Sequence, residues 1–256
     1  MRHERGKCNK FTIVFLQKKQ MAQLPILMYH NVSQKELESN GLTISIQKLE
    51  NQFRYLMENN FVSFHLSELE SQSTIPPKSV VLTFDDVTEN QLFYAYPLLE
   101  KYNLKATFFI PFQYIGKADL WNQGKEKIMS VQDLKSLSPR IELGLHSYAH
   151  GKYDSMSAAE INEDFEKSFQ IIEQNDLKVY HALAYPYGNF PKKNPKNASF
   201  KTILENNNIK MGLRIGNKVN KFPFRNRYEI MRIDVKGEDS LLQFKLKLRF
   251  GKLKLF

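Results

Sequence analysis

The chain has 256 residues, 42% of them hydrophobic and 25% charged, and its 11 glycines and 10 prolines exclude a fibrous or low-complexity polymer. A single cysteine, Cys8, excludes both a disulfide framework and a metal centre built from thiolates. Basic residues outnumber acidic ones by 37 to 27, and residues 190–256 hold 17 basic but only 5 acidic side chains. This excess favours an anionic partner, namely a membrane surface, a phosphate-bearing substrate or nucleic acid, although a solvated basic surface explains it equally well.

The beginning of the chain contains one short apolar run, at residues 11–16, with lysines on both sides. A secretory signal needs about 7–15 apolar residues, and crossing a bilayer needs roughly 18–20, which no stretch of the chain reaches. We therefore expect residues 1–23 to be a disordered extension, with Met21 as an alternative start. We also expect the protein in the cytoplasm or on the cytoplasmic membrane face, with association with the cell envelope as an option.

Short apolar runs alternate with amphipathic stretches along the rest of the chain. Strands are expected at residues 25–29, 79–84, 106–110, 141–145, 182–185, 211–215 and 229–235. Helices are expected after Ser45, over residues 89–102, after Ser130, and after Ser157, which forms a capping box with Glu160. This alternation predicts parallel βαβ units, and because no Gly/Ser linker interrupts it, we predict one α/β domain.

The last segment, residues 237–256, is basic and amphipathic. Over residues 243–256, phenylalanine and leucine alternate with lysine and arginine. As a strand, this segment would have one apolar face and one cationic face. Such a strand fits either the edge of a sheet or contact with an anionic membrane, whose headgroups attract the cations while the apolar side chains insert.

Ionisable residues end, or directly follow, four of the predicted strands. They are His30, Asp85, Asp86, His146 and Tyr185. In a parallel β/α barrel the carboxyl ends of the strands converge on one face, where active sites lie. We therefore expect two carboxylates and three imidazoles, with His150 as the third, in one cleft.

The chemistry of these side chains is that of a metal-dependent hydrolase. His146 and His150 with one aspartate would give a cation three protein ligands and leave a position for water. A bound divalent cation lowers the pKa of water and polarises a carbonyl. Of the adjacent Asp85 and Asp86, one can bind the metal while the other accepts a proton from water, and His30 is then the best available proton donor.

Three motifs in this order resemble the polysaccharide deacetylase family, the carbohydrate esterases with the nodulation-deacetylase homology fold. They are Thr83-Phe-Asp-Asp86, His146-Ser-Tyr-Ala-His150 and Tyr185-Pro-Tyr-Gly188. With Tyr29-His30 and Arg232-Ile-Asp234, the resemblance covers residues 24–236. The early Tyr-His pair is similar to the branch that de-N-acetylates poly-N-acetylglucosamine. The resemblance implies a distorted (β/α) barrel and hydrolysis of an N-acetyl group on a hexosamine.

The resemblance also implies a role for each site residue. Asp85 would be the general base, and a divalent ion, most often zinc, would be bound by Asp86, His146 and His150. Substrate-binding residues would be Tyr185, Pro186, Tyr187 and Gly188, with a backbone N–H of this segment helping to hold the oxyanion. His30 would protonate the departing amine. The implied partner is an N-acetylated glycan or a lipid-linked sugar.

Two positions depart from the family pattern. Val87 stands where most members have glycine, and a β-branched residue disfavours positive φ, so if the loop needs a left-handed residue at this position it must be rebuilt here. Ala184 stands where most members have the arginine that orients the base. Arg232, on a late strand of the same barrel, is our hypothesis for a substitute.

Two other functions compete with a metal-dependent deacetylase. A catalytically impaired carbohydrate-binding protein would have the same fold, and Val87 and Ala184 favour it. Nucleic-acid binding has only bulk charge in its favour, so no specific nucleic acid is expected. The residues leave open the sugar, its polymer length, and whether the acetyl group is on nitrogen or oxygen.

Overall fold

The computed structural model of the protein describes residues 21–252. Of the extension expected at residues 1–23, residues 1–20 lie outside the described range. Its last two residues belong to strand β1 (Ala22–Leu24). Within the described range, no helix combines the length and the apolar character needed to span a bilayer.

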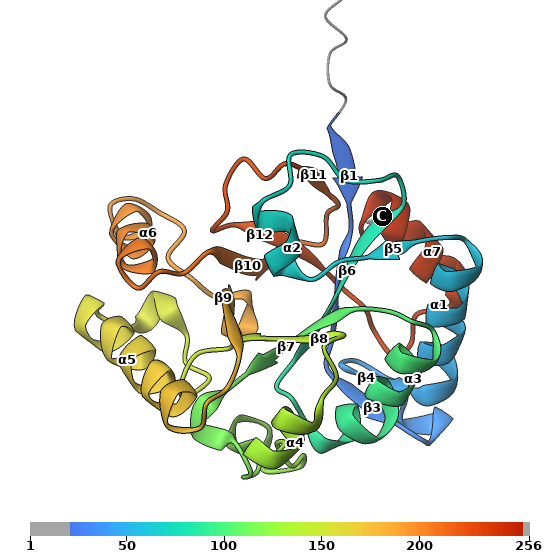
Figure 1. Ribbon diagram of the computed structural model, residues 1–256, viewed down its shortest axis with the longest axis horizontal. Coiled ribbons are helices and arrows are strands. Elements are labelled where there is room, and N and C mark those ends of the chain that lie inside the picture. Colours follow the sequence, from blue (N-terminus) through green and yellow to red (C-terminus); the bar gives the residue numbers. More distant parts are fainter. Residues whose placement is uncertain (1–20, 253–256) are drawn as a thin grey trace, which may run out of the picture.

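Seven parallel strands close into a barrel in the order β2-β12-β10-β9-β8-β7-β6, and β6 pairs back onto β2 (Figure 1). They are β2 (Ile26–Tyr29), β6 (Ser79–Asp85), β7 (Ala106–Ile110), β8 (Ile141–Leu145), β9 (Val179–Ala184), β10 (Met211–Ile215) and β12 (Ile230–Asp234). Each of the seven strands predicted before residue 237 is present, and the prediction of a distorted, single-domain (β/α) barrel is confirmed. The distortion is visible between β8 and β9, where the pairing register shifts.

Five short strands extend this barrel or lie at its ends. The short β5 (Val62–Ser63) pairs with the start of β6, and β1 pairs antiparallel with β11 (Asn220–Phe222). Strands β3 (Asn31–Ser33) and β4 (Thr43–Ser45) form a separate parallel pair that follows His30. Helices surround the barrel (Figure 1). They are α1 (Ile46–Glu58), α2 (Leu66–Glu70), α3 (Tyr96–Lys101), α4 (Val131–Ser136), α5 (Ala158–Gln174), α6 (Lys196–Asn206) and α7 (Leu241–Phe250).

The sequence sets both ends of these helices. The predicted caps Ser45, Ser130 and Ser157 each accept a hydrogen bond from a backbone N–H of the first turn. Four helices end in the same way, with a left-handed residue followed by an apolar residue whose N–H returns to a carbonyl five residues earlier. The left-handed residues after α1, α3, α5 and α6 are Asn60, Asn103, Asp176 and Asn208.

Two predicted elements differ from the structure. The helix expected over residues 89–102 is divided, because a π-helical segment (Gln91–Ala95) precedes α3, whose first turn contains Pro97. The strand expected near the C-terminus is wrong where the structure describes it: residues 241–250 form α7, and residues 253–256 lie outside the described range. Phe244 and Leu248 satisfy a helical period as well as the alternating one, and the capping box of Ser240 favours the helix.

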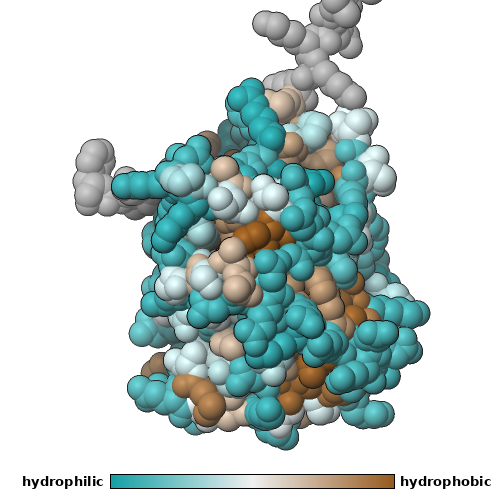
Figure 2. All heavy atoms as spheres, turned by 90° about the vertical axis from the view of Figure 1, so that its left-hand side faces the viewer, coloured by the Kyte–Doolittle hydropathy of each residue, from teal (hydrophilic) through white to brown (hydrophobic). Residues whose placement is uncertain are grey.

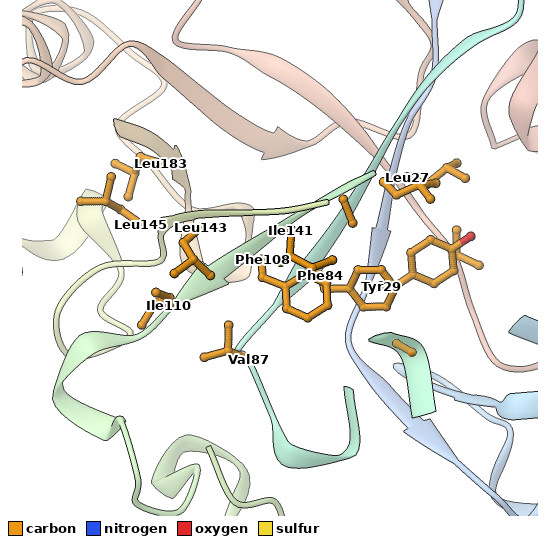
Figure 3. Packing of buried hydrophobic residues seen from close by; sticks show 14 of the residues in the cluster. Leu27, Tyr29, Phe84, Val87, Phe108, Ile110, Ile141, Leu143, Leu145 and Leu183 are labelled. Atoms are coloured by element: carbon orange, nitrogen blue, oxygen red, sulfur yellow. The ribbon is translucent and has the colours of Figure 1, made fainter. Parts of the chain in front are cut away.

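The apolar core has two layers, one on each side of the barrel wall. Alternate residues of β6 divide between them: Val80, Leu82 and Phe84 face the outer helices, and Val81 joins the cluster inside the barrel. The outer layer is rich in aromatic rings, with Tyr29 and Phe84 stacked at 5.0 Å between centroids (Figure 3). Inside the barrel, Phe109 fills the space beside Gly144, where a Cβ would lie 2.6 Å from its ring. On the side of α5 and α6, hydrophilic side chains cover most of the surface (Figure 2).

Candidate metal and catalytic site

Three of the predicted site residues meet at the carboxyl ends of the barrel strands. Asp86 follows β6, and Oδ1 of its carboxylate lies 3.5 Å from Nε2 of His146 and 3.3 Å from Nε2 of His150. All three side chains are buried, and their potential ligand atoms lie within 4.8 Å of one another. Oδ1 of Asp86 has no hydrogen-bond partner. A buried carboxylate oxygen without a partner, facing two imidazole nitrogens, fits a divalent cation.

Each histidine of this cluster is oriented through its other ring nitrogen. Nδ1 of His146 lies 2.8 Å from the carbonyl oxygen of Ala184, which can only accept a hydrogen bond. Nδ1 therefore carries the proton, and the unprotonated Nε2 is available to bind a metal ion. Nδ1 of His150 lies 3.1 Å from the hydroxyl of Tyr187. Burial lowers the pKa of His146 to about 4, despite the opposing effect of Asp85. His146 is therefore neutral at neutral pH, as a metal ligand must be.

The second carboxylate, Asp85, is hydrogen-bonded to Arg232, and the ε-nitrogens of His30 and His146 lie further away, at 3.7 and 3.9 Å from its Oδ2. Arg232 extends from β12 inside the barrel and makes two hydrogen bonds to Asp85, Nη1 to Oδ1 at 2.5 Å and Nη2 to Oδ2 at 2.8 Å. Burial would raise the pKa of Asp85, but Arg232, His146 and His30 together hold this pKa well below its usual range. Asp85 is therefore ionised at neutral pH, and Arg232 makes the contact expected where Ala184 replaces the family arginine.

His30 completes the group. Its Nε2 lies 3.7 Å from Oδ2 of Asp85, and its side chain is 13% exposed. Gln91 ties these two strand ends together, because its side-chain amide donates to the carbonyls of His30, at 2.9 Å, and of Asp85, at 2.6 Å. Nδ1 of His30 is buried without a partner, and so is Oδ1 of Asp234 on the neighbouring strand β12.

The four residues predicted to bind substrate are not equivalent. Tyr185 is fully buried, and its hydroxyl donates to the carbonyl of Tyr228, so its side chain supports the turn and the assignment of that side chain to a substrate pocket is wrong. Pro186 is buried too, and Gly188 is buried at a φ of 64°, with Ile215 against the position of a Cβ. Tyr187 alone of the four exposes its side chain, by 51%.

Val87 adopts the left-handed conformation in the loop that carries Asp86. Val87 is fully buried and adopts a φ of 44°, next to a φ of 76° at Asp86. Its carbonyl accepts a hydrogen bond from the N–H of Met129, and its side chain belongs to the outer layer of the core (Figure 3). Packing therefore holds a β-branched residue in the left-handed region, at a cost of about 1–3 kcal/mol.

The structure also brings residues to the site that the sequence did not indicate. The ring of Trp121 stacks on that of His150, at 4.1 Å between centroids and 14° between planes. Asp164 on α5 accepts from the N–H of Tyr148 and from the hydroxyl of Tyr153, each at 2.8 Å, and so anchors the loop that contains His150. Trp121 lies in a long loop without periodicity, whereas Asp164 is a polar residue on the apolar stripe of a predicted helix, a signal that could have been noticed.

Fold and site together define a class: single-domain (β/α) barrels with an Asp-His-His cluster at the carboxyl ends of the strands. Within this class, the chain belongs to the polysaccharide deacetylase family, whose model matches residues 72–204.

Among curated proteins, the chain is 24% identical over 192 residues to a putative polysaccharide deacetylase, YxkH, of Bacillus subtilis. That match covers 73% of the chain but 64% of YxkH, less than two thirds of its length. It is 25% identical over 240 residues to the poly-beta-1,6-N-acetyl-D-glucosamine N-deacetylase of Staphylococcus epidermidis, covering 83% of the chain and 78% of that protein.

Solved structures share the fold. The Streptococcus pyogenes deacetylase PplD, in complex with acetate, matches with a TM-score of 0.74 at 20% identity, over 91% of this chain and all of that one. IcaB from Ammonifex degensii matches with a TM-score of 0.72 at 22% identity, over 90% of this chain and 97% of that one. At these identities the likeness concerns the fold.

Proposed function

We propose that this protein hydrolyses the N-acetyl group of a hexosamine in a polysaccharide or a lipid-linked sugar, with zinc bound by Asp86, His146 and His150. The observation that carries the proposal is the buried, unpartnered Oδ1 of Asp86 facing two ε-nitrogens. One carboxylate and two imidazoles are a typical ligand set of catalytic zinc. The N-deacetylase of S. epidermidis supports the choice of substrate class.

Asp85 is the general base in this mechanism. When bound by the triad, a divalent cation lowers the pKa of a water molecule and polarises the acetyl carbonyl. Oδ2 of Asp85 lies 3.9 Å from Nε2 of His146, so it adjoins the triad and can accept the proton as water attacks the carbonyl carbon. Arg232 keeps Asp85 ionised and fixes its orientation through two hydrogen bonds.

The tetrahedral adduct then needs an oxyanion donor and an acid. The N–H groups of Tyr185, Gly188 and Asn189 donate to backbone carbonyls, so we assign the oxyanion to the N–H of Tyr187. His30, 3.7 Å from Asp85, donates a proton to the nitrogen as the carbon–nitrogen bond breaks. The products are acetate and a free amine.

Acetate release tests this proposal. The substrates are N-acetylated hexosamine polymers, O-acetylated counterparts and lipid-linked N-acetyl sugars. We expect release from an N-acetyl substrate that a chelator abolishes and zinc restores, and that His146→Ala abolishes. His181→Ala is the matched control, because the His181 ring packs on Phe169 and is not part of the site. Glycan binding without acetate release from any substrate would instead support a catalytically impaired binding protein.

We further propose that α7 contacts an anionic membrane, where a lipid-linked sugar would be found. Leu241 and Leu242 are exposed at the start of this helix and Phe250 at its end, where the exposed Arg249 lies over the Phe250 ring. Exposed apolar side chains next to cations favour insertion among anionic headgroups.

Vesicle sedimentation tests this contact. The double variant Leu242→Ser/Phe250→Ser should bind vesicles with anionic lipid more weakly than the unmodified protein does, and neither should bind neutral vesicles. Leu37→Ser is the control, because Leu37 is a fully exposed leucine outside α7. Equal binding by the double variant would contradict the proposal.

A further inference from the structure

His150 is held between two aromatic side chains. On one side, the Trp121 ring is stacked on it, with 4.1 Å between centroids and 14° between planes. On the other, the Tyr187 ring stands nearly perpendicular to it at 4.7 Å, and the Tyr187 hydroxyl lies 3.1 Å from its Nδ1. Rotation of the imidazole would break both contacts.

The other histidine of the triad is fixed differently. His146 follows β8 directly, and its Nδ1 is bonded to the backbone carbonyl of Ala184, which is itself part of the barrel. His150 lies in a loop at a φ of 54°, and its ring is bonded to a side chain. The position of the His146 ring therefore depends on the backbone, whereas that of the His150 ring depends on neighbouring side chains.

The loop that carries Trp121 is itself well braced. Asp119 is 2% exposed and accepts from the N–H of Glu126, at 2.9 Å, and from the side-chain amide of Asn122, at 2.8 Å. The ring of Tyr114 stands edge-on to Trp121 at 4.8 Å and 75°. The indole is therefore held in place before any ligand arrives.

We propose that Trp121 is a positioning residue, which keeps Nε2 of His150 directed at Oδ1 of Asp86 and so sets the affinity of the triad for a divalent cation. The inference rests on the proposed metal site. Nε2 and Oδ1 lie 3.3 Å apart, a geometry in which both atoms can share one ion. Residues that orient a metal ligand typically change metal affinity by about 10–100-fold when they are mutated.

Trp121 is the single tryptophan of the chain, so its own fluorescence reports on the contact. Zinc added to metal-free protein should change the tryptophan emission and saturate at one equivalent. In Asp86→Asn the same titration should give little or no change. Unchanged emission in a protein that binds one zinc, as measured by native mass spectrometry, would contradict the proposal.

Zinc affinity of variants gives the second test, by competition with a chromophoric chelator. Trp121→Ala and Trp121→Leu should bind zinc about 10–100-fold more weakly, since leucine keeps apolar volume without a planar face. Trp121→Phe keeps the stacked ring and should stay close to the unmodified protein. Phe93→Ala, which truncates an aromatic residue that is 59% exposed, is the control and should leave affinity unchanged.

The outcomes separate this inference from the proposed function. If the unmodified protein binds no zinc, the metal site is wrong and this inference fails with it. The second case is that the unmodified protein binds zinc and that Trp121→Ala and Trp121→Leu bind it with the same affinity and unfold at the same temperature. In that case only the role of Trp121 is wrong. Recovery of affinity in Trp121→Phe supports positioning by the ring rather than a general effect on the loop.

Discussion

The two ends of the barrel interior both bury carboxylates, but their surroundings differ. Towards the amino end, Glu142 accepts hydrogen bonds from the N–H groups of Leu66 and Ser67, each at 3.0 Å, and from the hydroxyl of Thr107 at 2.8 Å. At the carboxyl end, Asp86 has a buried oxygen with no partner. Burying a carboxylate is costly unless it is compensated. Glu142 thus stabilises the first turn of α2, while Asp86 remains available for a ligand.

Backbone conformation also differs between the two ends of the barrel. At the helix ends that lead into the strands, the left-handed residues are asparagine and aspartate, which tolerate this conformation. At the site, an aspartate and a histidine, Asp86 and His150, also adopt this conformation, but so do the β-branched Val87 and the bulky Tyr187, for which it is strained. The strain at these two residues lies in loops that carry functional groups.

The largest expected effect is at Asp86. Asp86→Asn keeps the shape of the side chain but removes its charge, and should abolish tight zinc binding. The kcat/KM for acetate release should fall by about 10³-fold or more, because a bound cation supplies several kcal/mol of charge stabilisation. Steady-state kinetics and metal analysis of the same sample would measure both. Full activity without bound metal would show that the unpartnered oxygen is not a ligand.

Asp85 should behave differently from its neighbour. Asp85→Asn should lower kcat by about 10²-fold or more through loss of the general base, while zinc content stays near one per chain. It should also lower the free energy of unfolding by about 3–5 kcal/mol, because Arg232 would be left buried and unpaired. Kinetics, metal analysis and urea unfolding test the three expectations. Loss of zinc with unchanged stability would reverse the roles of the two aspartates.

The fold and the gathering of the site could be predicted from the sequence for a simple physical reason. Strand ends in a parallel barrel share one face, so residues such as Asp86 and His146 could be placed together without knowing any side-chain conformation. The caps at Ser45 and Ser157 are equally local, because their partners lie within one helical turn. The turns after the helices carried such a signal as well, in pairs like Asn59-Asn60.

Features that depend on longer-range packing could not be predicted. Tyr185 and Tyr187 are two residues apart in one turn, yet one is buried and the other exposed, because the turn takes a φ of 59° at Tyr187. The stacking of Trp121 depends on a loop that no periodicity describes. The sequence of residues 241–250 is compatible with both the alternating period of a strand and the period of a helix. The structure has the helix, in which Phe244 packs into the outer layer of the core.

Glu142, at the amino end of the barrel, tests the other half of the comparison between the two ends. Glu142→Ala should lower the free energy of unfolding by about 2–4 kcal/mol, because it leaves buried donors of α2 and β7 without an acceptor. Zinc affinity should not change, since Glu142 is outside the triad. Urea unfolding and chelator competition measure the two quantities. Glu142→Gln keeps one acceptor oxygen and should lose less stability, and a loss of zinc affinity in either variant would mean that the two ends are coupled.

The smallest effect, but one of unusual sign, is expected at Val87. A buried valine normally tolerates alanine better than glycine, because glycine loses one more methyl, about 0.8 kcal/mol, and gains freedom in the unfolded chain. At a φ of 44° alanine keeps most of the left-handed penalty of about 1–2 kcal/mol, which glycine escapes. Val87→Gly should therefore be no less stable than Val87→Ala in urea unfolding. A deficit of more than about 1 kcal/mol for the glycine variant would mean that the carboxyl end stores no strain at this loop, and the contrast in backbone strain between the two ends would then rest on Tyr187.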